Sequence, residues 1–511
     1  MQIIDNRALQ LQLRNPTRVT TVIPKSKQVG PHEVLVHWGV DETHALRDLN
    51  IKAPAPIRSR YNWPGQHRPM AHQETTAEFL TMHRKAFCFN EQGTGKTASA
   101  IWAADFLMQQ KKVRRALVVC PISIMDSAWR SDLFTFAMHR SVNIAYGSAD
   151  KRRKIINGGS EFIIINYDGL GIVEDEVRNG GFDLIIVDEA SHYKNAQSKR
   201  WKVMNRLVTP DTWLWLMTGT PAAQSPTDAF GLAKLVSPQN VPKFYGAFRD
   251  MVQHKVTQFR WENKPTAVET VHRVLQPAVR FSKDECLDLP DLMYTSRHVP
   301  MTKQQEVYYK KFKKDLMMEA AGAEVTAANA AVKMNKLLQI SAGAVYTDDG
   351  DTLEFDIGNR YKVLKEVIDE TTKKVLVFVP FKSTIRMLAD TLRGDGITTE
   401  VISGDVSAGA RTDIFNRFQT TPDPRVLVIQ PQAAAHGVTL TAANTVVWWA
   451  PTSSLETYAQ ANARIHRSGQ TSKCTVVHLE SAPVERRLYD MLAKRIDIHA
   501  QILNLYKELL D

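Results

Sequence analysis

Residues 91–97 read Glu-Gln-Gly-Thr-Gly-Lys-Thr, and this stretch decides the expected fold of the chain. A short apolar run, 86–89, precedes it, and an alanine-rich, helix-prone segment, 98–108, follows it. Gly93 and Gly95, on either side of Thr94, allow the backbone to bend so that successive N–H groups and a helix N-terminus face one phosphate group. The sequence therefore predicts a strand, a phosphate-binding loop and a helix in succession.

The last two residues of the stretch carry the chemistry of such a loop. Lys96 would reach the β- and γ-phosphates of a nucleotide, and Thr97 offers a hydroxyl ligand to Mg²⁺. The full pattern G-x-x-x-x-G-K-[ST] is not met, because Asn90 stands where the first glycine should be. A glycine turn with an accidental Gly-Lys-Thr is the alternative, and an acidic pair that holds the metal decides between the two interpretations.

That acidic pair follows a second apolar run. Residues 184–187 are aliphatic throughout, as expected of a parallel strand that is buried on both faces, and Asp188 and Glu189 stand at the carboxyl end of the run. Asp188 would hold Mg²⁺, and Glu189 would orient and deprotonate the attacking water. Because two strand ends both carry phosphate chemistry, a nucleotide site is favoured over a solvated acidic turn.

Composition describes a large, basic and ordinary globular chain. With 511 residues it is too long for one core, so two to four domains are expected. It has neither an apolar run near the ~20 residues that span a bilayer nor the layout of a signal peptide, so we expect a cytoplasmic protein that is not secreted. The four cysteines form no C-x-x-C pair, which argues against zinc and disulfides, and Cys88 and Cys120 are expected in the core.

The charge balance favours a polyanionic partner. The formal net charge is +11 and the sequence pI is near 9.3. Any one basic cluster is more often a solvated face than a binding site, but several on one molecule favour binding to a phosphate backbone, with an affinity that falls with salt. The clusters are 111–115, 151–154, 199–206 and 310–314.

The chain before the phosphate loop reads differently from the rest. Residues 1–66 predict a small β-containing accessory unit with strands over 19–23 and 33–40 and a helix over 43–50, followed by a proline-rich connector. A helix over 70–80 then leads to the loop. Within it, Gln73 would read the adenine base, although a glutamine on a helix surface is the simpler interpretation.

Two aromatic residues that precede this helix could also either contact the nucleotide or pack in the core. Tyr61 or Trp63 would stack on the base of the nucleotide, although an aromatic residue beside Pro64 is as easily a packing residue. No function can be assigned to the accessory unit itself.

Two stretches alternate between strand and helix patterns, which predicts α/β lobes with parallel sheets and helices on both faces. The first lobe spans 67–235, and the residues that follow its strands should line one crevice. The second spans 361–482 and has no phosphate loop of its own. The predicted strands are 86–89, 116–120, 162–165, 184–187 and 213–217 in the first lobe, and 375–379, 400–402, 426–429, 445–449 and 475–479 in the second.

The remaining segments read as helical. Residues 236–360 predict helical protrusions and a linker, with helices over 301–312 and 320–340, a stop at Gly343 and no strand. Residues 483–511 predict a closing helix or two.

The order of the strand-end motifs resembles that of the Swi/Snf-type branch of the superfamily-two helicases, which are ATP-driven motors on double-stranded DNA. The resemblance covers most of the chain from about 68 to 480. Its motifs in the first lobe are His72-Gln73, the phosphate loop, VVCP at 118–121 through Trp129, Asn166-Tyr167, DEASHYKN at 188–195 and MTGTPAAQSP at 217–226, and FSKDECLDLPDL at 281–292 is similar to the brace region.

The second lobe continues the resemblance, most tellingly in ETYAQANARIHRSGQ at 456–470, which matches the pattern QAxxRxHRxGQ. The other matching stretches are 375–381, 402–411 and 426–449. Three positions depart from the family: Ala435-His436 replace paired glycines, Pro451 replaces an aspartate, and Gln224 replaces an asparagine. The first departure puts the strength of ATP–DNA coupling in doubt.

The resemblance implies two tandem RecA-like lobes that use ATP and Mg²⁺. Arg464 and Arg467, expected in a helix, would stabilise charge on the transferring phosphoryl group as arginine fingers, although an arginine in such a helix is usually a surface salt bridge. Thr218-Gly219-Thr220 and Gln470 would couple the two lobes, although a simple turn is a credible alternative for the former.

The expected partner is double-stranded or branched DNA, contacted through its backbone by a monomer that uses no membrane. The candidate contacts are Lys194, Asn195, Lys199, Lys202, Lys310, Lys311, Lys313 and Lys314. The alternatives are a strand-separating DNA or RNA helicase, and a non-enzymatic nucleic-acid clamp with a vestigial ATPase. A small-molecule P-loop kinase would leave the second lobe unexplained.

Overall fold

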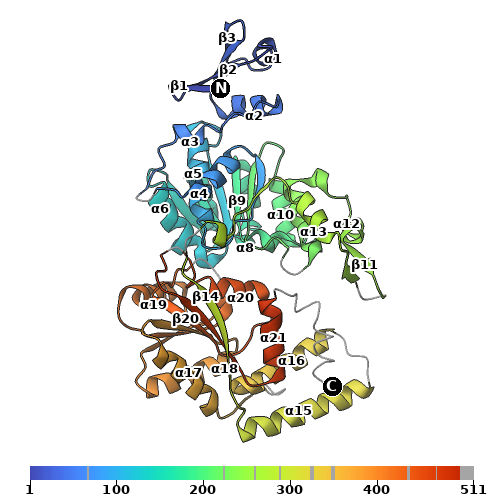
Figure 1. Cartoon of the computed structure of the whole chain (residues 1–511), viewed down its shortest axis with the longest axis vertical. Helices are drawn as coiled ribbons and strands as arrows, with labels where there is room; N and C mark the ends of the chain where they lie inside the picture. Colours follow the sequence, from blue (N-terminus) through green and yellow to red (C-terminus); the bar gives the residue numbers. More distant parts are fainter. Residues whose placement is uncertain are drawn as a thin grey trace. The chain divides into compact units, whose positions relative to one another are not determined.

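The structure is a computed structural model of the whole chain, in which the chain divides into two compact units (Figure 1). The first unit comprises 1–222 and 226–286, and the second comprises 223–225 and 287–511. Within the described residues, no helix has both the length and the apolar character needed to cross a membrane. The described residues are 1–65, 68–222, 225–257, 261–286, 289–322, 327–346, 351–433, 438–467 and 469–494.

A seven-stranded parallel sheet forms the centre of the first unit, in the order β13-β5-β10-β9-β6-β8-β7. All five predicted strands of this lobe are confirmed. The strands β7 and β13 were not predicted: both lie at edges of the sheet, β7 is only partly buried, and β13 has two residues. The strands are β5 Lys85–Cys88, β6 Ala116–Cys120, β7 Val142–Ala145, β8 Phe162–Asn166, β9 Leu184–Asp188, β10 Trp213–Met217 and β13 Ala278–Val279.

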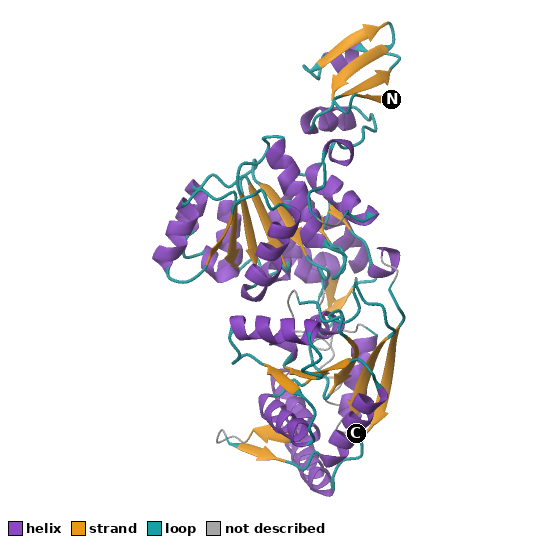
Figure 2. Cartoon of the chain, turned by 90° about the vertical axis from the view of Figure 1, so that its left-hand side faces the viewer, coloured by secondary structure: helices purple, strands orange, loops and turns teal. Residues whose placement is uncertain are grey.

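Helices cover both faces of this sheet (Figure 2). Alternate residues of one strand enter different cores: Val118 packs in one core with the helix that follows the phosphate loop, and Leu117 and Val119 pack in the other. This explains why the central strands are apolar throughout. The helices are α3 Ile57–Arg60, α4 Ala71–Thr81, α5 Lys96–Gln109, α6 Ser131–Phe136, α7 Ala149–Asn157, α8 Tyr167–Leu170, α9 Glu174–Asn179, α10 Lys199–Leu207, α11 Ala229–Val236, α12 Tyr245–Val252, α13 Ala267–Val274 and α14 Lys283–Cys286.

The N-terminal residues of the first unit form a separate four-stranded antiparallel sheet with its own core. The predicted strand over 19–23 is wrong: Val19 lies in helix α1 and packs in that core with Ile23, four residues on, a helical spacing. The predicted strand over 33–40 is confirmed in its first five residues, and the predicted helix is confirmed. The elements are β1 Gln2–Ile4, β2 Ala8–Gln12, α1 Thr17–Thr20, β3 Ser26–Gly30, β4 Glu33–His37 and α2 Val40–Asp48.

The second unit contains a six-stranded parallel sheet in the order β14-β21-β20-β17-β19-β18. Its five predicted strands are confirmed. The expectation of no strand between 236 and 360 is wrong, because β14 pairs with β21 along its whole length at the edge of this sheet. The strands are β14 Leu292–His298, β17 Lys374–Phe378, β18 Thr399–Ile402, β19 Val426–Ile429, β20 Ala443–Trp448 and β21 Cys474–Glu480.

Two hairpins also occur in the stretch that was expected to be helical. They are β11 Gln253–Lys255 with β12 Trp261–Asn263 in the first unit, and β15 Ala344–Tyr346 with β16 Thr352–Glu354 in the second. The two predicted helices are present as α15 Lys303–Gly322 and α16 Ala327–Ala342, and Gly343, with φ +115°, ends the latter as expected. The other helices of the second unit are α17 Gly358–Glu370, α18 Lys382–Gly394, α19 Ala408–Thr420, α20 Leu455–Asn462 and α21 Pro483–Ala493. The first part of the predicted closing helix is α21, and residues 495–511 lie outside the described residues.

One buried histidine should make the second unit sensitive to acid. The ring of His478 stacks on Tyr489 at 4.1 Å between centroids, and its Nε2 forms a 2.8 Å hydrogen bond with the Tyr458 hydroxyl. Burial lowers the pKa of His478 from 6.5 to about 4. As the pH falls from 6.5 toward 4, the unfolded chain binds a proton that the folded chain excludes, so the free energy of unfolding should drop by roughly 3 kcal/mol.

Denaturant unfolding of the wild type and of His478→Gln at several pH values checks this expectation. The variant should lose the roughly 3 kcal/mol that His478 adds to the fall in stability between pH 6.5 and 4, and replacing the exposed His32 by glutamine should leave the pH dependence unchanged. Identical pH dependence in the wild type and His478→Gln would contradict the assignment.

Candidate nucleotide-binding site

The phosphate loop joins β5 to α5 and needs both of its glycines. Gly93 and Gly95 have φ values of +86° and +81°, which favour glycine. A Cβ on Gly95 would also lie 2.1 Å from Nε2 of Gln73. A residue with a side chain at either position would therefore strain the loop, and at position 95 it would also displace the Gln73 amide.

Lys96 is the first residue of α5, and its side chain folds back over the loop. Nζ donates hydrogen bonds to the backbone carbonyl oxygens of Asn90 at 2.9 Å and Glu91 at 3.2 Å. Thr97 follows it in the first turn of the helix, half-buried. This places an ammonium group and a hydroxyl group at the end of the helix where a phosphate group binds.

Asp188 ends β9 and is held by a tryptophan. Its carboxylate accepts a 3.0 Å hydrogen bond from Trp129 Nε1 at one oxygen and a 3.0 Å bond from the N–H of Glu189 at the other. Burial raises the pKa of Asp188, whereas the charge of Lys96 and these two hydrogen bonds lower it. Each oxygen keeps lone pairs for a hard cation, so the site fits Mg²⁺.

Glu189 follows with an unusual backbone. Its φ of +50° lies in the left-handed region, which costs of order 1 kcal/mol for a residue with a side chain. The Tyr167 hydroxyl donates to the carbonyl oxygen of Asp188 at 2.6 Å, and Gln92 Nε2 donates to Glu189 Oε1 at 3.3 Å. The acidic pair is thus fixed by Tyr167, the first residue of α8, and by Gln92 of the phosphate loop.

Gln73 contacts the phosphate loop directly. Its Oε1 accepts a hydrogen bond from the N–H of Met70 at 3.0 Å, and its Nε2 donates one to the carbonyl oxygen of Thr94 at 3.2 Å. The Nε2 atom of His72 forms a hydrogen bond of 2.8 Å with the same oxygen. Its role in reading adenine stays a prediction.

The two aromatic residues considered for base stacking are packing residues. Tyr61 is buried and donates to Asp105 Oδ2 at 2.6 Å, and Trp63 packs edge-on against Trp102 behind the loop helix. Both rings are buried in the core of the first unit, so the structure favours the packing interpretation over base stacking.

The segment 218–220 lies against the phosphate loop. The N–H of Thr218 donates to the Cys88 carbonyl oxygen at 3.0 Å, and that of Thr220 to the Thr218 hydroxyl at 3.2 Å. A Cβ on Gly219 would lie 3.7 Å from the Asn90 carbonyl oxygen. Parallel strand ends therefore bring this segment, Asp188 and the loop to one edge of the sheet, as predicted, while the coupling role stays a prediction.

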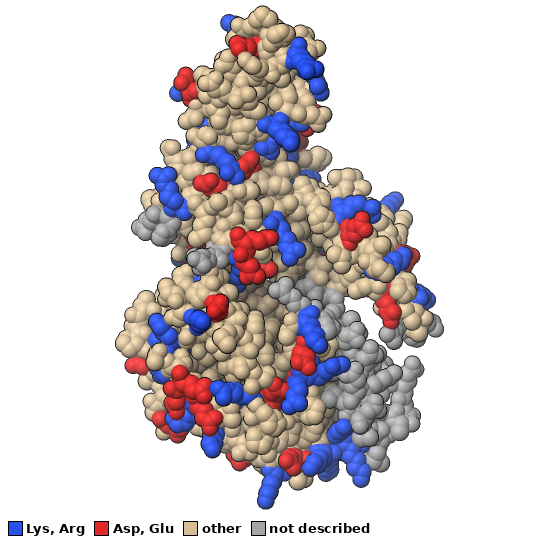
Figure 3. Space-filling view, in the orientation of Figure 1, with Lys and Arg blue, Asp and Glu red and all other residues tan. Residues whose placement is uncertain are grey.

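The predicted DNA-binding residues fall into two sets, one in each unit. Lys199 and Lys202 are exposed on α10, and Lys194 Nζ lies 3.3 Å from the carboxylate of Asp228. The exposed Asn195 accepts from the N–H of Gln197. In the second unit, the lysines of the 310–314 cluster lie on α15, where Figure 3 shows basic side chains together. Their contact with DNA stays a prediction.

The arginines expected as fingers lie just beyond a helix and not within one. Helix α20 ends at Asn462, and the chain turns there. Arg464 is buried and donates to the carbonyl oxygens of Gln460 at 3.0 Å and Val438 at 3.1 Å, and Arg467 Nη1 donates to the Val438 oxygen at 3.1 Å. The turn lets both side chains reach the carbonyl oxygen of Val438. Val438 directly follows residues 434–437, which lie outside the described residues.

Gln470 fixes the end of the same segment. Its Nε2 lies within hydrogen-bond distance of the carbonyl oxygens of Thr441, Ala443 and Ile465, and its Oε1 accepts from the N–H groups of Thr471 and Ser472.

Of the three departures from the family pattern, Ala435-His436 and Gln224 lie outside the described residues, and Pro451 is buried after β20.

The sequence motifs contain Trp129 and Tyr167 without giving either a role, and nothing in them pointed to Gln92. The sequence feature that could have identified Trp129 is its place in the motif that follows β6. We expect Trp129→Phe, which keeps an aromatic ring but removes the indole N–H, to raise the Mg²⁺ concentration for half-maximal ATP turnover by about tenfold. Magnesium titration of turnover measures this, with Trp213→Phe as the control; equal values for the wild type and Trp129→Phe would contradict it.

The first unit holds a phosphate loop and an acidic strand end on a parallel sheet, and a second parallel α/β unit follows it. These features define a protein with two RecA-like lobes. Residues 72–343, more than half of the chain, match the SNF2-related domain, and 359–469 match the helicase conserved C-terminal domain. The chain belongs to the SNF2-related family, as the resemblance indicated.

Individual relatives are distant. The chain is 25% identical over 401 residues to the uncharacterized ATP-dependent helicase MG018 of Mycoplasma genitalium, covering 76% of this chain and 37% of the relative. It is 24% identical over 455 residues to the human DNA annealing helicase and endonuclease ZRANB3, covering 84% and 40%. The chain thus spans about two fifths of the length of these relatives. Among solved structures, the Sulfolobus solfataricus SWI2/SNF2 ATPase core in complex with dsDNA matches with a TM-score of 0.42 at 20% identity, covering 88% of this chain and 97% of that one.

Proposed function

We propose that this protein is an ATP-driven motor that translocates on double-stranded DNA, hydrolysing ATP to ADP and phosphate to remodel, anneal or branch-migrate the DNA. The observation that carries the proposal is the hydrogen-bonded arrangement of Lys96, Asp188 and Glu189 around one phosphate loop. Membership of the SNF2-related family supports the reaction, and one relative is named as a DNA annealing helicase.

The first lobe carries the chemistry of hydrolysis. The loop N–H groups and Lys96 bind the phosphates, with Gln73 at the base. Thr97 and Asp188 hold Mg²⁺, which neutralises charge on the phosphate oxygens when it is bound. Glu189 orients a water molecule and accepts its proton.

The second lobe adds arginine side chains to the positive charge that Lys96 provides in the first lobe. Arg467, with Arg464 as its partner, stabilises the charge that develops on the transferring phosphoryl oxygens. Both are already turned toward one carbonyl oxygen of their own lobe, so a single movement of this segment would redirect them together. ATP would close the lobes and hydrolysis would reopen them, with Thr218-Gly219-Thr220 and Gln470 coupling this movement to the site.

DNA is bound through its backbone. The net charge of +11 favours a polyanion, and the exposed Lys199 and Lys202 of α10 and the lysines of α15 offer phosphate contacts. Binding should weaken as salt increases. We propose that the protein works as a monomer in the cytoplasm or nucleoid, on duplex or branched DNA.

ATP turnover with duplex DNA, single-stranded DNA, forked DNA and RNA tests the proposal. Duplex or forked DNA should stimulate hydrolysis, and triplex displacement should report tracking along the duplex, with fork-regression and strand-annealing assays run in parallel. Stimulation by RNA alone would favour an RNA helicase. Hydrolysis that no nucleic acid stimulates would leave a clamp as the better interpretation.

A further inference from the structure

Gln92 is the residue of the phosphate loop that touches the acidic pair through its side chain. It stands between Glu91 and Gly93, and its Nε2 donates to Glu189 Oε1 at 3.3 Å. A glutamine amide is long enough to bridge from the loop to the end of β9, and it bears no charge that would compete with Lys96 for the phosphates.

The backbone of Glu189 is already fixed, whereas its carboxylate needs separate support. The Tyr167 hydroxyl binds the preceding carbonyl oxygen at 2.6 Å, and the N–H of Glu189 donates to Asp188 at 3.0 Å. These contacts set the left-handed φ of +50° but leave the side-chain rotamers to be chosen. The hydrogen bond from Gln92 favours one of them.

Gln92 also lies close to the segment that is expected to couple the lobes. A Cβ on Gly219 would lie 3.7 Å from the backbone nitrogen of Gln92 and 3.8 Å from its Cγ. Gly219 therefore faces Gln92, with little more than the space of a methyl group between them. A shift of this segment would move Gln92, and through its amide the Glu189 carboxylate.

We infer that Gln92 is a positioning residue, whose amide holds the Glu189 carboxylate toward the attacking water and transmits movement of the 218–220 segment to it. This inference rests on the proposed function, because it assigns Gln92 a role in the same hydrolysis. It is independent of the DNA that the motor uses.

The kinetic test replaces Gln92 by methionine, which has a similar length and no donor. We expect kcat for DNA-stimulated ATP hydrolysis to fall roughly tenfold, the effect of losing one hydrogen bond to a charged group, with KM for ATP within about twofold of the wild type. Gln92→Glu should lower kcat further through repulsion between carboxylates. Gln239→Met, at an exposed glutamine of the same unit, serves as the control. An unchanged kcat, or a rise in KM alone, would overturn the inference.

A second measurement does not need activity. Thermal unfolding of the nucleotide-free wild type, Gln92→Met, Glu189→Ala and the double variant forms a double-mutant cycle. The double variant should be less destabilised than the sum of the single variants, because either change already breaks the same hydrogen bond. Strict additivity would show that the two side chains do not interact and would overturn the inference.

The two experiments separate this inference from the proposed function. If the wild type hydrolyses ATP and responds to DNA while Gln92→Met does the same, only the positioning role fails. If the wild type shows no hydrolysis, the proposed function fails and the catalytic role of Gln92 fails with it, even where the unfolding cycle shows that the contact exists.

Discussion

Replacing Lys96 by alanine should reduce ATP turnover by roughly a thousandfold, the effect of removing a positively charged group that stabilises the transition state. The same substitution removes the hydrogen bonds from Nζ to the carbonyl oxygens of Asn90 and Glu91. It also removes the charge that lowers the pKa of Asp188. Both the phosphate-binding group and the metal ligand should therefore be impaired.

Turnover in the presence of duplex DNA, measured at saturating Mg²⁺, checks this expectation. Lys52→Ala, at an exposed lysine of the N-terminal sheet region, should behave as the wild type. DNA binding without nucleotide should persist in Lys96→Ala, because the proposed DNA contacts lie elsewhere. Equal turnover in the wild type and Lys96→Ala would show that the loop is not the catalytic site.

The central strands of the two parallel sheets, which the sequence predicted correctly, share one physical property. Central strands of a parallel sheet are buried on both faces, so runs such as 184–187 stand out as apolar, and residues at their ends fall at one edge. For this reason the order of apolar runs along the chain is enough to place Asp188 and the 218–220 segment beside the phosphate loop.

Among the strands that were missed, the longest lacks this property. Strand β14 lies at an edge of its sheet and reads Leu-Met-Tyr-Thr-Ser-Arg-His, with most side chains half-buried or exposed. Its position depends on pairing with β21, almost two hundred residues further along the chain. Such pairing leaves no periodic signal within the strand itself.

The supporting contacts of the site could not be predicted for a related reason. Trp129 and Gln92 act through hydrogen bonds to Asp188 and Glu189, which are 59 and 97 residues away in the chain. Spacing along the sequence carries no information on such contacts. Similarly, the assignment of Arg464 and Arg467 to a helix failed because their bonds to the Val438 carbonyl oxygen require a turn.

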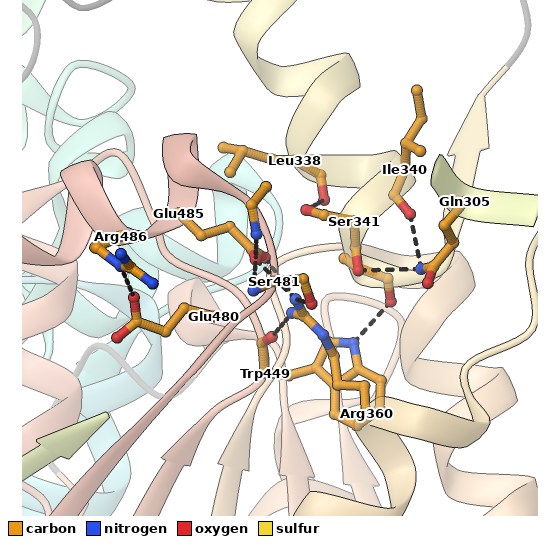
Figure 4. A network of polar contacts seen from close by, with 12 residues as sticks. Gln305, Leu338, Ile340, Ser341, Arg360, Trp449, Glu480, Ser481, Glu485 and Arg486 are labelled. Carbon is orange, nitrogen blue, oxygen red and sulfur yellow. Dashed lines mark hydrogen bonds and ion pairs between the residues drawn. The ribbon is translucent and has the colours of Figure 1, made fainter. Parts of the chain in front are cut away.

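The ion pair of Arg360 and Glu485 offers the second large effect, in the core of the second lobe (Figure 4). The two residues are 3% and 0% exposed. Arg360 Nη2 lies 2.9 and 2.7 Å from the two carboxylate oxygens, and it also donates to the Ser481 hydroxyl at 2.6 Å. The N–H groups of Ser481 and Ala482 donate to the same carboxylate at 2.6 and 3.1 Å. The pair thereby joins α17 to the start of α21.

The same pair reaches the end of β20. Arg360 donates to the Trp449 carbonyl oxygen, and the Trp449 indole donates to the carbonyl oxygen of Ala342 at 2.8 Å. Helix α16, which precedes the lobe, is thus bound to the strand end through one arginine and one tryptophan.

Glu485→Ala should lower the free energy of unfolding of the second lobe by about 3–5 kcal/mol, because it leaves the Arg360 guanidinium buried without a counter-charge. Glu366→Ala, at an exposed position of α17, should change it by less than about 0.5 kcal/mol. Arg360→Met combined with Glu485→Met should be less destabilised than Glu485→Ala, since no charge remains in the core. Denaturant unfolding followed through tryptophan fluorescence measures all four proteins, and a Glu485→Ala protein as stable as Glu366→Ala would show that the carboxylate does not stabilise the lobe.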